Sequence, residues 1–140
     1  MNDWIIYTDG SYRASKNQGG VGVVWLKNNE FVQEFSKGFK GETNNTMELK
    51  AIWIALFSIK KQIDSLEIIS DSEYCIGVIT NPTWNPKKNV ELINKIKKQL
   101  QDTQKLVKEP IKFTHVKGHN GDKWNERANT LAQNASELIL

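Results

Sequence analysis

The chain has 140 residues, of which 39% are hydrophobic and 25% are charged, and its formal net charge is +3. The single cysteine, Cys75, excludes an intramolecular disulfide, and no run of residues approaches the length of about 18 apolar residues that a membrane-spanning helix needs. The start, MNDWIIYTDG, lacks the basic segment and the long apolar run of a signal peptide. We therefore expect one globular domain over residues 1–140, located in the cytoplasm.

Three strand-like segments come first, at residues 4–8, 20–27 and 30–36. The first, WIIYT, ends at Asp9-Gly10, and the other two flank Asn28-Asn29, a turn pair typical of a hairpin. Residues 11–20 are rich in polar residues and glycine, and we expect a loop there. The three segments together predict an antiparallel meander.

Residues 44–62 change to a helical period. Trp53, Ile54 and Phe57 widen the apolar stripe, which predicts a helix buried on more than one side. A short apolar strand follows at residues 66–70, ending at Asp71-Ser72. The next expected elements are a short helix at 73–80, a loop at 81–89, a helix at 90–106, a strand at 111–116, a loop at 117–122 and a final helix at about 123–137.

This order predicts an α/β fold with a five-stranded mixed sheet, its first three strands antiparallel and helices on both faces. The charge is uneven, since residues 81–117 contain nine lysines and three acidic residues. Such a basic block favours an anionic partner, with nucleic acid as the first candidate. The alternative is a solvated helix face, because lysine is also common on exposed helices.

Three acidic residues are candidate ligands for a metal ion. Asp9 and Asp71 each end a strand, and ligands of open α/β sheets bind at such ends. Glu48 falls in the first turn of the predicted helix. Each acid alone has a simpler explanation, as a turn former or as a partner of the helix dipole. Together they would repel one another unless a cation neutralised them, and carboxylates suit Mg²⁺ or Mn²⁺ better than zinc.

The chain resembles a type 1 ribonuclease H of the retroviral-integrase/ribonuclease H superfamily. The matching segments, in the order and spacing of that family, are IIYTDGS (5–11), GGVGVV (19–24), TNNTMELKAI (43–52), IISDSEY (68–74), KKNVEL (87–92), VKGHNG (116–121) and WNERANTLA (124–132). The resemblance implies an endonuclease that uses two Mg²⁺ ions, for which Mn²⁺ can substitute, to cut the RNA strand of RNA/DNA hybrids. The expected products have 5′-phosphate and 3′-hydroxyl ends.

The family holds its metals with four acidic residues, and this chain has three of them. The resemblance assigns Asp9 as the ligand shared by both metals, with Glu48 and Asp71 as further ligands. The fourth position is Asn129, where the family has aspartate. An amide oxygen can still bind a hard cation, but it adds no negative charge. We expect weaker binding of the second metal, so that hybrid binding persists and cleavage is impaired; the alternative for Asn129 is a plain surface amide.

The resemblance also implies residues that act on the substrate. His119 matches a loop histidine that assists proton transfer or product release, and Glu126 matches a position near the metals. The implied substrate-binding residues are Gly10, Ser11, Thr43, Asn44, Asn45, Glu73, Trp84, Asn89 and Asn125. Simpler roles remain open for several of them. Thr43 and Asn44 could be helix N-caps and nothing more. Trp84 could simply pack within a loop, and His119 could be a solvated loop residue.

Three other functions remain open from the sequence. The first is a protein that binds RNA/DNA hybrids without cutting them, which Asn129 favours. The second is a DNA-cutting nuclease of the same superfamily, which the RNA-contacting amides of TNNTMELKA disfavour. The third is a fold whose acids only form turns. Because Asp9 follows so soon after the start, we expect no separate hybrid-binding module. We also expect a monomer with no obligate protein partner and no membrane contact.

Overall fold

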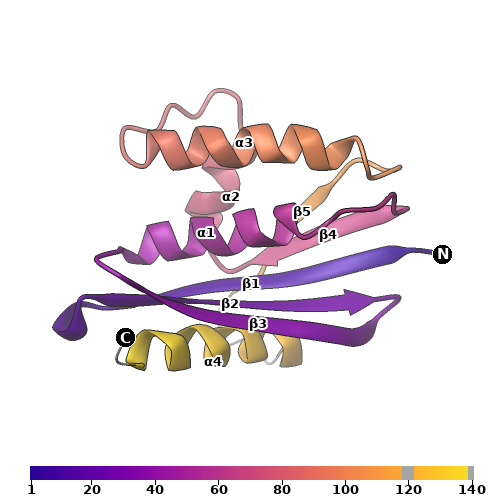
Figure 1. Ribbon diagram of the computed structural model, residues 1–140. Coiled ribbons are helices and arrows are strands. Elements are labelled where there is room, and N and C mark those ends of the chain that lie inside the picture. The colour runs from indigo at the N-terminus through magenta and orange to yellow at the C-terminus, as the bar shows by residue number, and fades with distance from the viewer. Residues whose placement is uncertain (118–121, 139–140) are drawn as a thin grey trace.

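The computed structural model describes residues 1–117 and 122–138 (Figure 1). His119 therefore lies outside the described residues. The elements in chain order are β1 (Asp3–Arg13), the 3-10 helix η1 (Ala14–Lys16), β2 (Gln18–Lys27), β3 (Glu30–Lys40), α1 (Asn44–Phe57), β4 (Ser65–Ser70), α2 (Glu73–Thr80), α3 (Val90–Gln104), β5 (Lys112–His115) and α4 (Lys123–Glu137). None of the helices in this described part is both long enough and apolar enough to cross a membrane.

The strands form one five-stranded sheet in the order β3-β2-β1-β4-β5. β1, β2 and β3 are antiparallel neighbours, whereas β4 runs parallel to β1 and β5 runs parallel to β4. The predicted mixed sheet is confirmed. The parallel pairing sets the carboxyl end of β4 beside the middle of β1, where Asp9 lies, because β1 continues past Asp9 to Arg13.

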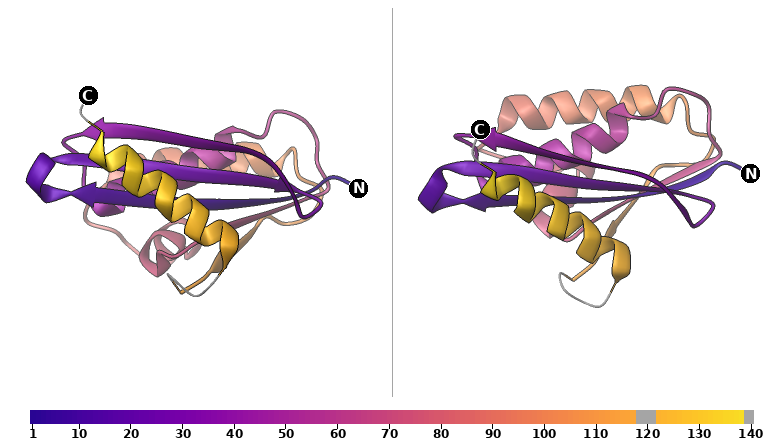
Figure 2. Two further views of the ribbon diagram at one scale, coloured as in Figure 1. Left: turned by 90° about the horizontal axis from the view of Figure 1, so that it is seen from below. Right: turned by 60° about the horizontal axis from the view of Figure 1, so that its bottom comes forward.

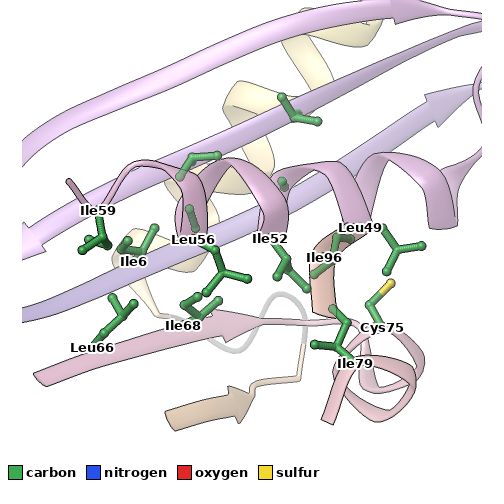
Figure 3. Close-up of a cluster of buried hydrophobic side chains, with 14 of the residues drawn as sticks. Ile6, Leu49, Ile52, Leu56, Ile59, Leu66, Ile68, Cys75, Ile79 and Ile96 are labelled. Atoms are coloured by element: carbon green, nitrogen blue, oxygen red, sulfur yellow. The ribbon is translucent and has the colours of Figure 1, made fainter. Parts of the chain in front are cut away.

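Helices cover both faces of the sheet, as predicted. α1, α2 and α3 lie on one face and α4 lies alone on the other (Figure 1). Seen from the α4 side, this helix crosses the antiparallel strands at an angle (Figure 2). The larger core fills the space between the sheet and α1, where Ile6, Ile52 and Ile68 are fully buried (Figure 3). A smaller cluster, including Tyr7 of β1 and Leu131 of α4, packs between the sheet and α4.

The helix α1 is shorter than its apolar period indicates. It was expected to reach residue 62, but it ends at Phe57. The Ser58 hydroxyl donates to the Ala55 carbonyl at 2.6 Å and accepts from the Trp25 indole N–H at 2.8 Å, which fixes the chain at the helix end. Ile59 lies beyond the end of α1 and is buried in the core. It therefore fits the apolar period of the helix without being part of the helix.

The burial of α1 on two sides is confirmed, because the helix lies between the sheet and α3. Thr43 is its N-cap, and the Thr43 hydroxyl accepts a hydrogen bond from the Thr46 amide at 3.2 Å. Glu48 was expected in the first turn, but it is the fifth residue of α1 and lies in the second turn. The helix dipole acts mainly within the first turn, so it does not account for an acid at this position.

The hairpin of β1 and β2 is longer than its apolar runs indicate. β1 continues to Arg13 and β2 begins at Gln18, so the loop predicted at residues 11–20 is reduced to η1 and Asn17. Asn17 adopts the left-handed conformation with φ 47°, which asparagine tolerates better than most residues. Gly20, which was expected in the loop, lies in β2. Glycine is needed there because α4 packs so closely that a Cβ would overlap its backbone.

Candidate active site

Asp9 and Asp71 lie side by side because of strand register. Thr8 of β1 pairs with Ser70, the last residue of β4, and Asp9 and Asp71 are the residues that follow these two in the chain. Asp9 remains within β1 and pairs on its other side with Gly22 of β2. The parallel arrangement thus brings the two carboxylates together as predicted, but only Asp71 follows a strand end; Asp9, which was expected to end its strand, lies within β1.

Glu48 reaches the same place from α1. The helix approaches β1 at Gly10, where a Cβ would overlap the Glu48 amide nitrogen and the Met47 backbone. Only glycine permits this approach, which gives Gly10 a structural role whether or not it binds substrate. One carboxylate oxygen from each of Asp9, Glu48 and Asp71 lies within 4.8 Å of the others. The three predicted acids therefore form one cluster.

Burial makes this cluster unfavourable without a cation. Asp9 is 2% exposed and Glu48 is 5% exposed. Burial, followed by the charge of Asp71, raises the pKa of Asp9 to about 7. Burial and the charges of Asp9 and Asp71 likewise raise the pKa of Glu48 well above its ordinary value. Oxygens Oδ1 of Asp9 and Oε2 of Glu48 are buried without a hydrogen-bond partner among the described residues.

This donor set fits a hard divalent cation. Carboxylate oxygens that lack any other partner are the ligands that Mg²⁺ and Mn²⁺ prefer, and a cation would offset the repulsion within the cluster. The described part of the chain provides no thiolate or imidazole ligand in the cluster. Cys75 is buried and its pKa is raised to about 12, chiefly by burial, so its thiol stays neutral.

Asn129 lies on the turn of α4 that packs over the strand pair carrying Asp9. A Cβ at Gly22 would overlap the Ala128 carbonyl oxygen, and Gly22 is the partner of Asp9 in the antiparallel pair. Paired residues of antiparallel strands point to the same face of a sheet. Asn129 itself is half-buried, not fully exposed.

The turn that carries Asp71 is ordered by Ser72, which the sequence placed in it, and by Ser70 and His115, for which no such role was predicted. The Ser70 hydroxyl accepts a hydrogen bond from the Ser72 amide at 3.1 Å, and the Ser72 hydroxyl caps α2 by accepting from the Cys75 amide at 3.2 Å. Nε2 of His115, at the end of β5, lies 3.2 Å from the Asp71 carbonyl oxygen. The alternation of serine and aspartate in SDS is the sequence signal for this turn.

Two predicted substrate-binding residues meet at one corner of the molecule, through a third residue that was not predicted. The Thr46 hydroxyl lies 2.8 Å from the Thr43 hydroxyl and donates to the Asn89 side-chain oxygen at 3.4 Å. Asn89 has a left-handed backbone, with φ 59°, just before α3. Asn44 and Asn45 are exposed on the first turn of α1 nearby. We call Thr43, Thr46 and Asn89 the polar corner.

The other predicted contacts are placed differently. Trp84 stacks edge-on against Tyr74, with ring centroids 5.7 Å apart, and covers Gly77 of α2, yet 40% of it stays exposed. It packs a loop, as the simpler interpretation held, and still offers a surface. Asn125 is only 3% exposed, so it cannot reach a ligand without a change around it. The exposure of the rest varies: Glu73 and Glu126 are exposed and Ser11 is half-buried.

Comparisons with known proteins agree with this geometry. The family model described as RNase H matches residues 1–137. A protein named Ribonuclease H from Clostridium botulinum is 35% identical, over 98% of this chain and 97% of its own length. Proteins of the same name from Syntrophomonas wolfei and Paracidovorax citrulli are 35% and 36% identical, over 99% and 98% of their own lengths. The similarity extends over both the sheet and α4.

Proposed function

The chain belongs to the ribonuclease H family, and from this premise we propose that it hydrolyses the RNA strand of RNA/DNA hybrids, leaving 5′-phosphate and 3′-hydroxyl ends. The observation that carries the proposal is the cluster of Asp9, Glu48 and Asp71, in which two buried oxygens have no hydrogen-bond partner in residues 1–117 and 122–138. An ordinary turn-forming aspartate is exposed and has no reason to be buried beside two other acids.

In this proposal Asp9 is shared between two metal sites, while Glu48 and Asp71 each serve one of them, and Asn129 offers an amide oxygen. When bound, two Mg²⁺ ions supply the charge that activates a water and stabilises the leaving 3′ oxygen, and Mn²⁺ can replace them. Asp9, Glu48 and Asp71 would hold the ions, and the burial of Asp9 and Glu48 keeps other water away from the charges.

Asn129 lowers the negative charge of the proposed metal site. With asparagine the site has three formal negative charges where the family has four, so its affinity for the second metal falls. We propose that cleavage is attenuated while hybrid binding persists. A protein that binds hybrids without cutting them is the second candidate, and the same residue favours it.

Substrate contacts follow from the exposed polar groups around the cluster. The polar corner holds a backbone phosphate, and the amides of Asn44 and Asn45 read the nucleotides that flank the cut, through their 2′-hydroxyl groups. Trp84 offers its exposed surface to the DNA strand, and His119 assists proton transfer or product release. Gly10, Ser11 and Glu73 complete the proposed substrate site, and the buried Asn125 joins it only after the residues around it move. Residues 1–140 act as one monomeric domain in the cytoplasm.

The experiment that tests this function compares the chain with Asp9→Asn on four labelled substrates: RNA/DNA hybrid, duplex RNA, duplex DNA and single-stranded RNA. The proposal expects Mg²⁺-dependent cutting of the hybrid alone, slow in this chain and absent in Asp9→Asn. Asp102→Asn is the matched control, since Asp102 is an exposed acid on α3 that forms ion pairs with the surface lysines Lys98 and Lys105. Equal cutting by Asp9→Asn and the parent would refute the assignment of the site.

A further inference from the structure

A groove of about 310 Å³ lies between the edge strand β3, α1 and α3. Its walls include Phe35, Lys37, Phe39, Lys50, Trp53 and Lys95. We call it the β3–α1–α3 groove. None of the roles derived above uses these side chains.

The groove exists because β3 extends beyond the cover of α1. Phe35, Lys37 and Phe39 alternate along the strand and therefore share its α1 side. β3 is the edge of the sheet and most of it is exposed, including 37% of Phe35. Trp53 on α1 forms the opposite wall and stacks on Phe57, with ring centroids 4.7 Å apart.

Lysines are placed directly on these rings. Nζ of Lys50 lies 4.3 Å from the centre of the Phe39 ring, and Nζ of Lys95 lies 4.4 Å from the centre of the Trp53 ring. Nζ of Lys37 lies 5.3 Å from the same Phe39 ring. Cation–π contacts of this kind hold the ammonium groups along the groove rather than letting them extend into solvent.

The charge of the groove is largely unbalanced. Lys50 pairs with Glu42, but within residues 1–117 and 122–138 no carboxylate forms an ion pair with Lys37 or Lys95. Several cations held along one groove repel one another, and an anionic ligand relieves that repulsion. The occupant that fits is therefore anionic, and it should present flat apolar groups to the rings.

The groove also adjoins the polar corner. Lys50 follows Thr46 by one turn of α1, and Lys95 lies on the second turn of α3, which begins directly after Asn89. A chain that passes the polar corner can thus continue into the groove along the same two helices. This continuity favours nucleic acid over a separate acidic peptide.

We propose that the β3–α1–α3 groove binds an unpaired stretch of nucleic acid that continues from the hybrid at the metal site; the inference rests on the proposed function. Phosphates meet the lysines, and a base lies against the exposed ring of Phe35. A duplex does not suit the groove, because its bases are already stacked and paired and offer no free face. The groove thereby favours hybrids that end in a single-stranded extension.

The test measures binding of a labelled blunt hybrid and of the same hybrid with a single-stranded extension, in EDTA so that no strand is cut. Extensions of DNA and of RNA are placed in turn at each end. We expect at least one extension to tighten binding by about tenfold, the effect of one stacked base. Lys37→Gln/Lys95→Gln removes this gain, and it lowers the salt dependence of binding by about 0.7 per lost phosphate contact.

The matched control is Lys108→Gln/Lys112→Gln, which removes two exposed lysines outside the groove and should keep the gain. Equal affinity of the parent for blunt and extended hybrids would overturn the inference, as would equal loss of the gain in both double variants. So would an acidic phenylalanine-containing peptide that outcompetes the extension in the groove. If the parent neither binds nor cuts the blunt hybrid, the proposed function itself fails; if only the gain is missing, the groove assignment alone fails.

Discussion

Gly10 lies so close to Glu48 that a β-carbon on residue 10 would overlap the Glu48 amide nitrogen. One missing methyl group on β1 thus sets the distance between a strand that carries one metal ligand and a helix that carries another. The contact links backbone packing directly to the geometry of the site.

Gly10→Ala should therefore impair both stability and metal binding. Because the added carbon meets backbone, α1 has to move, at a cost of about 1–3 kcal/mol for overpacking. We expect a lower free energy of unfolding and the loss of most of the thermal stabilisation by Mg²⁺. Gly41→Asn is the control: a Cβ at Gly41 meets nothing within 4 Å, and asparagine tolerates its φ of 70°. Unchanged Mg²⁺ stabilisation in Gly10→Ala would show that α1 need not approach β1 so closely.

The metal-free protein should lose stability as the pH rises. Asp9 has an ordinary pKa of 3.8 in the unfolded chain and a pKa of about 7 in the folded protein. The folded state therefore binds more protons between these values, so the stability present below pH 4 is lost as the pH passes through 7. At about 1.4 kcal/mol per pH unit, the Asp9 contribution is on the order of 4 kcal/mol.

Mg²⁺ should reverse this loss, since a cation favours the charged carboxylates. We expect denaturant unfolding in EDTA to show falling stability from pH 4 to pH 8, and Mg²⁺ to stabilise far more at pH 8 than at pH 5. Asp9→Asn should flatten the pH dependence and abolish most of the Mg²⁺ effect. A metal-free protein whose stability rises across this pH range would contradict the raised pKa of Asp9.

Thr46→Val should weaken substrate binding without stopping catalysis. The substitution keeps the shape of the side chain but removes the hydroxyl that joins Thr43 to Asn89. We expect KM for the hybrid to rise about fivefold, the effect of roughly 1 kcal/mol from one hydrogen bond, with kcat little changed. Thr103→Val is the control, because it removes a buried hydroxyl that donates to the Leu56 carbonyl at 2.9 Å, far along α1 from the polar corner. If both variants leave KM unchanged, the polar corner does not hold substrate.

Much of this structure could be predicted from the sequence, since local patterns determine much of it. The alternation of strands and helices predicted the five-stranded mixed sheet, and the places of Asp9 and Asp71 after apolar runs predicted that they would meet, although β1 continues past Asp9. Element ends were less predictable. α1 stops at Phe57 because Ser58 is fixed by Trp25, a contact between residues far apart in the chain.

Several features that sequence reasoning missed, such as the role of Thr46 and the packing of Trp84, depend on tertiary contacts. Thr46 looks like an ordinary helix residue until α3 brings Asn89 against it. Trp84 was predicted to contact substrate, but the sequence does not show that its ring packs onto Gly77, where a side chain would leave no room for it. The β3–α1–α3 groove has no sequence signal either, because its walls come from three separated segments.

The central claim is that Asn129 stands in place of a metal-binding carboxylate, and Asn129→Asp tests it most directly. We expect the variant to cut a labelled RNA/DNA hybrid in Mg²⁺ faster than this chain by on the order of 10²-fold, with hybrid affinity little changed. Asn134→Asp, an exposed change of the same charge on α4, should have no such effect. Equal rates for the parent and Asn129→Asp would mean that the site works with three carboxylates and that Asn129 is not a ligand.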